Sequence, residues 1–286
     1  MRVNRLKRDD PDFPDILRQI PSPPKDLFWA GTHPNEFLDK PRVAIVGSRK
    51  VSGYGRAVTE QLASELARAK VVIISGLALG VDSIAHQSTL NAGGLTIAVL
   101  PTSLDQIYPA SHLNLARQIV DSGGCLISEY PLKTEAYKTN FIARNRLVSG
   151  LADVLLITEA AKNSGTMHTA GFALEQGRTV MAVPGNINSP GSEGCNNLIK
   201  SGALPATNAD DIFFALRIDP KTPKQTKIFR GSDNEQKILG FIRRGMNDTE
   251  DLAKAAKLGG PDLSAALTML EINGYIRAEG GNWTLV

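Results

Sequence analysis

Glycine, serine and arginine cluster directly after an apolar run, in a pattern that suits the binding of a phosphate group. Gly47, Ser48 and Arg49 follow the run VAIV, and Ser52 precedes a helical stretch. Glycine lets a backbone approach an anion closely, serine offers a hydroxyl donor, and arginine can grip a phosphate in two places. The spacing is neither GxGxxG nor GxxxxGK[ST], the usual dinucleotide and triphosphate motifs. By itself the cluster fits either a phosphate grip or a turn with a solvated arginine.

Similar glycine-containing turns follow three other apolar runs. Ser75 and Gly76 open the second turn, which continues to Asp82, and the others cover residues 159–166 and 184–187. In an open parallel sheet the carboxyl ends of the strands meet at one edge, where loops and helix N-termini present unpaired N–H groups. Four such turns at one edge favour a nucleotide or a polyanion as the ligand.

The segment KTNFIARNR joins cations, an amide and an aromatic ring within nine residues. Its candidate contacts are Lys138, Phe141, Arg144, Asn145 and Arg146. Bases stack on aromatic or guanidinium planes while cations follow the backbone, so this composition suits a single strand of nucleic acid. The alternative is a solvated helix start with Phe141 in the core. We favour the strand-binding interpretation.

No arrangement of residue types in the sequence supports a catalytic site. Asp82 and His86 are four residues apart on a predicted helix, which allows an acid–base pair, but a helix cap and a packed histidine are the favoured interpretation. Asp105, Glu129 and Glu159 each end an apolar run without a Ser/His/Asp or paired-carboxylate pattern. We therefore predict a protein that is not an enzyme.

Short apolar runs alternate with amphipathic stretches from residue 42 onward. The runs are continuous rather than alternating, as expected for strands that are covered on both faces. We predict an α/β fold of the extended Rossmann-like type, with a doubly wound, mostly parallel sheet. The predicted strands are 43–46, 71–74, 95–100, 125–128, 154–158 and 179–183, and the predicted helices are 56–69, 82–92, 112–122, 141–151, 166–176 and 194–201.

Composition divides the chain into four predicted segments. Residues 1–40, rich in proline and aspartate, predict an irregular arm or partial domain, and residues 41–216 hold the sheet. Residues 217–232 carry five basic residues, one acidic residue and two prolines, which is typical of an exposed basic linker. Residues 233–286 predict three helices and a hairpin, the pattern of a winged helix. Its third predicted helix has no lysine or arginine, so we favour a protein contact or structural role over reading of a DNA groove.

Length and composition set limits on the class of protein. The chain of 286 residues is 42% hydrophobic and 21% charged, close to the globular average. No run approaches the roughly 18 to 20 apolar residues of a membrane helix, and no secretory signal opens the chain, so we expect a cytoplasmic protein without membrane contact. Cys125 and Cys195 lack CxxC spacing and the four histidines are scattered, so we predict no metal site and no cofactor. With a net charge of +3, any polyanion must be held by a local cluster.

Seven segments, in order, resemble the DprA/Smf family of DNA-processing proteins. The resemblance covers residues 41–203 almost continuously, and the tail is similar to that family's small winged-helix domain. The segments are VAIVGSR (43–49), SGLALGVDSIAH (75–86), GGLTIAVLPTSLDQIYP (93–109), ISEYP (127–131), FIARNRLVSGLAD (141–153), ITEAAKNSGTMHTAGFALEQGRTVMAVPG (157–185) and GCNNLIKSGA (194–203).

The resemblance implies a protein that binds single-stranded DNA, protects incoming strands during natural transformation or recombination, and hands them to the RecA recombinase. It also implies a homodimer and no catalytic role. Where this chain departs from the family pattern, around 101–105 and 167–168, we expect a reshaped pocket. By motif match the strand contacts would be Gly47, Ser48, Arg49, Ser75, Gly76, Lys138, Phe141, Arg144, Asn145 and Arg146, with Lys162 as a weaker candidate.

Two alternatives of other classes stay open. One is a nucleotide-acting enzyme of the phosphoribohydrolase type, which would share a Rossmann-like sheet and a nearby anion site. Those enzymes resemble PGGxGTxxE in a turn where this chain has NSGTMHTAGFALE (163–175). The other alternative is a nucleotide-sensing module, which would bind one mononucleotide tightly and oligonucleotides little.

Overall fold

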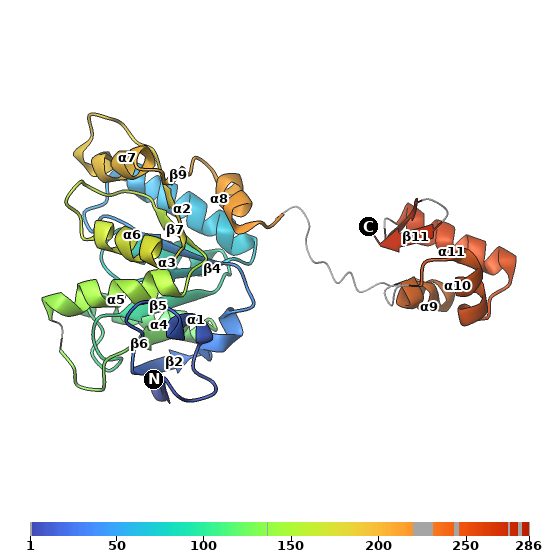
Figure 1. Cartoon of the computed structure of the whole chain (residues 1–286), viewed down its shortest axis with the longest axis horizontal. Coiled ribbons are helices and arrows are strands. Elements are labelled where there is room, and N and C mark those ends of the chain that lie inside the picture. Colours follow the sequence, from blue (N-terminus) through green and yellow to red (C-terminus); the bar gives the residue numbers. More distant parts are fainter. Residues whose placement is uncertain are drawn as a thin grey trace. The chain divides into compact units, whose positions relative to one another are not determined.

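The computed structural model describes residues 2–135, 137–219, 231–242, 246–273, 275–279 and 282–285. The chain divides into two units, Met1–Pro220 and Lys221–Val286 (Figure 1). Most of the predicted basic linker, residues 220–230, lies outside the described residues.

A single nine-stranded sheet forms the framework of the larger unit (Figure 1). The strands are β1 (Asn4–Lys7), β2 (Asp26–Gly31), β3 (Arg42–Val46), β4 (Val72–Ser75), β5 (Thr96–Leu100), β6 (Cys125–Ser128), β7 (Val154–Ile157), β8 (Thr179–Ala182) and β9 (Leu204–Pro205). Their order is β1-β2-β6-β5-β4-β3-β7-β8-β9. Strands from β6 to β9 pair in parallel, whereas β1 with β2 and β2 with β6 pair antiparallel. The predicted mostly parallel, doubly wound α/β fold is confirmed.

Helices cover both faces of the sheet, which explains the continuous apolar runs. In β3, Ala44 and Val46 pack on one face, whereas Val43 and Ile45 pack on the other. Every residue of such a strand therefore meets apolar side chains. The first face is covered by α1 (Asp15–Arg18), α5 (Lys138–Gly150), α6 (Thr166–Glu175) and α7 (Glu193–Lys200). The second is covered by α2 (Gly53–Arg68), α3 (Val81–Asn91), α4 (Leu113–Asp121) and α8 (Ala209–Leu216).

The sheet also takes in part of the segment expected to form an irregular arm. Strand β2 pairs with β6, and β1 pairs with β2 at the edge of the sheet. Prolines and aspartates lie mainly in residues 9–24, which connect the two strands through α1, and η1 (Pro34–Phe37) follows β2. The β2 sequence DLFWAG is apolar, and Leu27 and Ala30 are fully buried. The expectation of an irregular arm is therefore wrong for β1 and β2, because it reflects the composition of the connection between them.

The smaller unit contains three helices and a hairpin, as the sequence predicts. Leu252, Leu267 and Leu270 are among the buried side chains of its core. The second helix begins after Asp248, whose carboxylate accepts hydrogen bonds from the backbone N–H groups of the first turn. The elements are α9 (Asp233–Ile242), α10 (Thr249–Ala256), α11 (Gly260–Ile272) and the antiparallel pair β10 (Ile276–Glu279) and β11 (Asn282–Leu285).

Both cysteines lie in the core of the larger unit as free, buried thiols. Burial raises the pKa of both, that of Cys195 to about 11, so the reactive thiolate form is disfavoured. Across the described ranges, no helix is long and apolar enough to cross a membrane. Within the same ranges no group of three or more His, Cys, Asp or Glu side chains could hold a metal ion.

The chain changes direction across the sheet at β3, which creates a crevice. From β3 it moves outward through β4, β5 and β6, and then returns to place β7 on the other side of β3. Ligands of doubly wound sheets bind outside the carboxyl ends of the strands at such a switch point. The loops after β3 and β7 therefore define the place for a site.

His86, on α3, is held in its neutral form by burial. Its Nδ1 lies 2.7 Å from the hydroxyl of Thr96, and that hydroxyl donates to the carbonyl of Ile73 at 2.7 Å. Because the hydroxyl hydrogen is used there, Nδ1 must carry a proton and donate. Nε2 is buried without a hydrogen-bond partner. Burial, together with the nearby His112 and Arg144, lowers the pKa of His86 to about 3.

Acidification should therefore destabilise the protein through His86. Between the ordinary pKa of 6.5 and the folded value of about 3, the unfolded chain binds the extra proton, so the free energy of unfolding falls as pH falls. His86→Asn keeps a donor near Thr96 but cannot titrate, so its stability should depend less on pH. Urea unfolding at about pH 7 and about pH 5 measures this. Equal losses for wild type and variant would contradict the prediction, and His168→Asn, at an exposed histidine, is the control.

Candidate functional site

A cavity of about 660 Å³ opens at the crevice between β3 and β7. The loops after β3, β4 and β7 line it, together with one side of α5. Seven of the eleven predicted strand contacts lie around it: Gly47, Ser48, Arg49, Gly76, Phe141, Arg144 and Asn145. Segments that are far apart in the sequence therefore meet at one site, whereas Ser75, Lys138, Arg146 and Lys162 lie outside its lining.

Contacts to two neighbouring segments fix the loop after β3. The backbone N–H of Ser48 donates to the carbonyl of Glu159 at 2.8 Å, and its carbonyl accepts from the N–H of Val81 at 3.1 Å. Gly47 passes so close to both segments that a Cβ there would lie 2.7 Å from the Glu159 carbonyl oxygen and from a Val81 methyl group. A glycine is therefore required, and the loop presents Arg49 and Lys50 to solvent.

Arg49 lies over an aromatic ring at the cavity. Its guanidinium carbon is 5.1 Å from the centre of the Phe141 ring, within cation–π range. The Phe141 ring meets Tyr108 edge to face, with ring centres 5.3 Å apart. Phe141 is half-buried rather than part of the core, and Tyr108 is 46% exposed. Tyr108 was not a predicted contact, although the IYP motif after β5 is its sequence signal.

Arg144 forms part of the cavity wall from a buried position, with 3% of its surface exposed. One guanidinium nitrogen, Nη1, donates to the carbonyl of Gly76 at 2.6 Å and to that of Val99. A Cβ at Gly76 would come within 2.5 Å of the guanidinium, so glycine makes room for it. Burial lowers the pKa of Arg144 to about 10, while Asp82 opposes that shift, so the group stays charged at neutral pH.

Asp82 turns its carboxylate inward, toward the loop after β4. Its Oδ2 accepts from the N–H of Gly76 at 3.1 Å and from that of Ala78 at 3.3 Å. Burial raises the pKa of this carboxyl, although Arg144 and the hydrogen bonds act in the opposite direction. His86 bonds to Thr96 instead, so the two residues form a turn cap and a packed histidine rather than an acid–base pair. Ser75 is likewise used internally, its hydroxyl donating to the carbonyl of Ile45 at 2.6 Å.

Arg146 is engaged within the protein. Its two terminal nitrogens each lie 2.6 Å from an oxygen of Glu129, and the side chains of this pair are only 12% and 15% exposed. The same guanidinium donates to the carbonyls of Ser22 and Ala143. Four of its five N–H donors are therefore in use. Its role as a strand contact stays a prediction.

The two remaining predicted cations are exposed. Lys138 opens α5, one helical turn before Phe141. Lys162 lies 3.6 Å from Glu193, a surface pair whose lysine side chain is 65% exposed. Lys138 therefore adds an exposed cation one turn from Phe141, whereas the charge of Lys162 is partly neutralised by Glu193.

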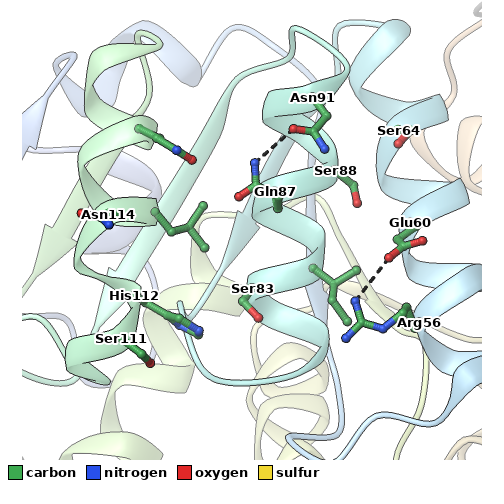
Figure 2. A pocket seen from close by; sticks show the side chains of 13 residues that line it. Arg56, Glu60, Ser64, Ser83, Gln87, Ser88, Asn91, Ser111, His112 and Asn114 are labelled. Carbon is green, nitrogen blue, oxygen red and sulfur yellow. Dashed lines mark hydrogen bonds and ion pairs between the residues drawn. The ribbon is translucent and has the colours of Figure 1, made fainter.

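A second hollow, of about 690 Å³, lies across α2, α3 and α4 and differs in chemistry. Figure 2 shows hydroxyl and amide side chains along it, with Gln87 bonded to Asn91 at 3.0 Å. Its arginine, Arg56, is paired with Glu60 at 3.4 Å. The lining cations of the first cavity are Arg49, Lys50 and Arg144, against one acid, Asp82. The first cavity is therefore the one suited to a polyanion.

Known proteins are similar to this chain in sequence. The chain matches the family model for DNA recombination-mediator protein A over residues 4–217, and the model for the DprA winged helix domain over residues 220–282. It is 38% identical to Protein Smf of Escherichia coli (strain K12) over 288 residues, which is 97% of this chain and 76% of that protein. It is also 38% identical to DNA processing protein DprA of Bacillus subtilis (strain 168), covering 75% of this chain and 71% of that protein.

Solved structures agree with the sequence matches. DNA processing protein A of Streptococcus pneumoniae superposes with a TM-score of 0.69 at 36% identity, covering 74% of this chain and 73% of that one. DNA processing protein A of Helicobacter pylori, whose structure was described for its single-stranded DNA binding mode, gives 0.65 at 36% identity, covering 75% and 95%. Since the family models span both units and the relatives match most of its length, the chain belongs to the DprA/Smf family of DNA recombination-mediator proteins.

Proposed function

We propose that this protein binds single-stranded DNA in the cavity at the β3–β7 crevice, protects incoming strands during natural transformation or recombination, and loads a RecA-type recombinase. It acts in the cytoplasm as a homodimer and without catalysis. The observation that carries the strand-binding part is the stacking of Arg49 on Phe141 beside a cavity whose wall includes the buried cation Arg144.

The arrangement of charge supports a phosphate backbone as the ligand. Arg49 and Lys50 are exposed and can reach phosphates directly, whereas Arg144 contributes positive charge from the cavity wall. Phosphates that are neutralised in this way release their counterions, which drives binding. Gly47, Ser48 and Gly76 bring backbone close to the same cavity, where Gly165 and Thr166 at the start of α6 also lie.

The rings at the cavity support an unpaired strand in particular. A base can stack on Phe141 or on the guanidinium plane of Arg49 only when its face is free, and a duplex buries those faces. Tyr108 supports the Phe141 ring from the side, and the amide of Asn145 lies on the cavity wall. The volume of about 660 Å³ falls within the range of cavities that bind small ligands, which suits a short part of a strand.

The roles of the other predicted contacts follow from their surroundings. Lys138 extends the path of the strand along α5, and Lys162 lies at its margin. Ser75 joins the end of β4 to β3, and Arg146 joins the later part of α5 to Glu129, in each case through internal hydrogen bonds. We therefore propose that both residues act on DNA binding indirectly, in place of the direct contacts that the sequence predicts.

Recombinase loading and dimerisation are supported by kinship rather than by contacts. The matching family model describes a recombination mediator, and relatives in Bacillus subtilis and Streptococcus pneumoniae are DNA processing proteins. The third winged-helix helix, α11, has no lysine or arginine in its sequence, which suits a protein contact better than a DNA groove. From the composition of the sequence we propose boundaries at 1–40, 41–216, 217–232 and 233–286, with residues 1–40 adding β1 and β2 to the sheet of residues 41–216 rather than forming a separate domain.

Removing the proposed contacts should weaken binding in two distinguishable ways. Arg49→Ala removes one phosphate contact, so the slope of log affinity against log salt should fall by about 0.7. Phe141→Ala removes a stacking surface worth about 1 to 3 kcal/mol, so affinity should fall roughly 5- to 150-fold with the salt slope unchanged. Fluorescence anisotropy with a labelled oligothymidylate measures both.

Arg56→Ala is the matched control, because Arg56 is an exposed arginine of the second hollow and is paired with Glu60. It should bind the oligonucleotide as the wild type does. Unchanged affinity in both Arg49→Ala and Phe141→Ala, or tighter binding to duplex than to single strand, would refute the proposed function.

Arg146→Ala should reduce stability rather than remove a direct DNA contact. The change leaves the carboxylate of Glu129 buried without its cation, which costs about 3 kcal/mol of unfolding free energy. Arg49→Ala, at an exposed side chain, should change it by no more than about 0.5 kcal/mol. Urea unfolding compares the two variants. An Arg146→Ala protein of wild-type stability that has lost oligonucleotide affinity would instead make Arg146 a strand contact.

A further inference from the structure

The N-terminus of α2 lies at the switch point, where a doubly wound domain commonly holds a phosphate group on its backbone amides. In this protein an internal carboxylate takes that position. The N–H of Ser52 lies 3.0 and 3.3 Å from the two carboxylate oxygens of Glu159, and its hydroxyl also donates to one of them. The same hydroxyl accepts from the N–H of Gly55 at 3.0 Å. Glu159 thus holds the N–H and the hydroxyl of Ser52, the N-cap residue of α2, and that hydroxyl in turn caps Gly55.

The surroundings of Glu159 are shaped to admit its carboxylate. Only 5% of the residue is exposed. A Cβ at Gly55 would lie 2.5 Å from one carboxylate oxygen, and a Cβ at Gly191 would lie 3.4 Å from its carboxyl carbon. Both glycines leave room for the carboxylate, one from α2 and one from the turn η3 (Pro190–Ser192). The packing around the crevice therefore accommodates the Glu159 carboxylate in a specific position.

We propose that Glu159 is a specificity-determining residue, an internal anion that fills the α2 N-terminus and excludes free phosphate groups and mononucleotides from it. A phosphate monoester placed there would have to displace the carboxylate or lie against it, and two like charges in a buried site repel strongly. Anions are then left to Arg49 and Lys50, on the exposed part of the same loop. A phosphodiester, which carries a substituent on two of its oxygens, can bind Arg49 and Lys50 without entering the α2 N-terminus.

The backbone N–H groups of the loop after β4 are also bonded to a carboxylate of the protein itself. The carboxylate of Asp82 accepts from the N–H groups of Gly76 and Ala78, so a second turn at this edge already holds an internal anion. Two of the turns that the sequence marks as phosphate grips are thus filled from within. Glu159 would exclude free phosphate whether or not the cavity binds DNA, and the two properties can be tested separately.

The test is to remove the carboxylate and offer a free anion. Glu159→Ala should bind inorganic phosphate at least about tenfold more tightly than the wild type, a difference of about 1.4 kcal/mol. Because a ligand of the folded state stabilises it, millimolar phosphate should raise the melting temperature of Glu159→Ala in a saturable manner and leave the wild type nearly unchanged. Adenosine monophosphate serves as the second probe and should behave as phosphate does.

Glu60→Ala is the matched control, since it removes the same charge from an exposed position on α2, the helix whose N-terminus Glu159 contacts. It should show the wild-type response to phosphate. A folded Glu159→Ala with no response beyond that of Glu60→Ala would overturn the proposal, as would a wild type that binds phosphate equally well. Oligonucleotide affinity does not enter this test, so its outcome is independent of the Arg49 and Phe141 experiments.

If Glu159→Ala does not fold, the wild-type protein can still be used to test the proposal. Amide resonances followed by NMR during a phosphate titration report on the helix terminus directly. The N–H of Ser52, bonded to Glu159, should not shift in a saturable manner. A saturable shift at Ser52 would show that phosphate reaches the terminus and would overturn the proposal.

Discussion

The contact between the loop after β3 and the end of β7 determines the geometry of the crevice. Glu159 makes this contact twice, through its carbonyl to the N–H of Ser48 and through its carboxylate to Ser52. Arg49 lies between these two fixed points, so its guanidinium is presented on a short, restrained loop. A restrained arginine loses less conformational entropy when it binds a phosphate. The position of Arg49 over Phe141 depends on the same restraint.

Buried charge in this domain joins segments of the chain to one another. Arg144 joins the ends of β4 and β5 through carbonyls, Arg146 holds Glu129, and Arg42 pairs with Asp153 at 2.6 Å. A buried charge is costly to desolvate, so each is compensated by acceptors or by an acid. This explains why a net charge of +3 says little about the site. What matters is that Arg49 and Lys50 remain exposed at the cavity.

Much of the fold could be predicted from the sequence because strands buried on both faces leave a continuous apolar signal. All six predicted strands correspond to strands of the structure, and no end differs by more than about one residue. Strands β1 and β2 leave a weaker signal in the sequence, because the proline-rich connection between them dominates the composition of the first 40 residues. The two-residue strand β9 is too short to leave a pattern.

By itself, the sequence determined the sheet, the helices that cover it and the winged-helix unit, because local patterns of residue types encode burial and turns. It also placed Gly47, Ser48 and Arg49 in a glycine-containing turn, and Phe141 in a cationic segment. Only the tertiary structure decided which cations reach the cavity. It buried Arg144, paired Arg146 with Glu129, and set Glu159 against the start of α2. These outcomes depend on contacts between residues tens of positions apart, and no local pattern of residue types records which donor meets which acceptor.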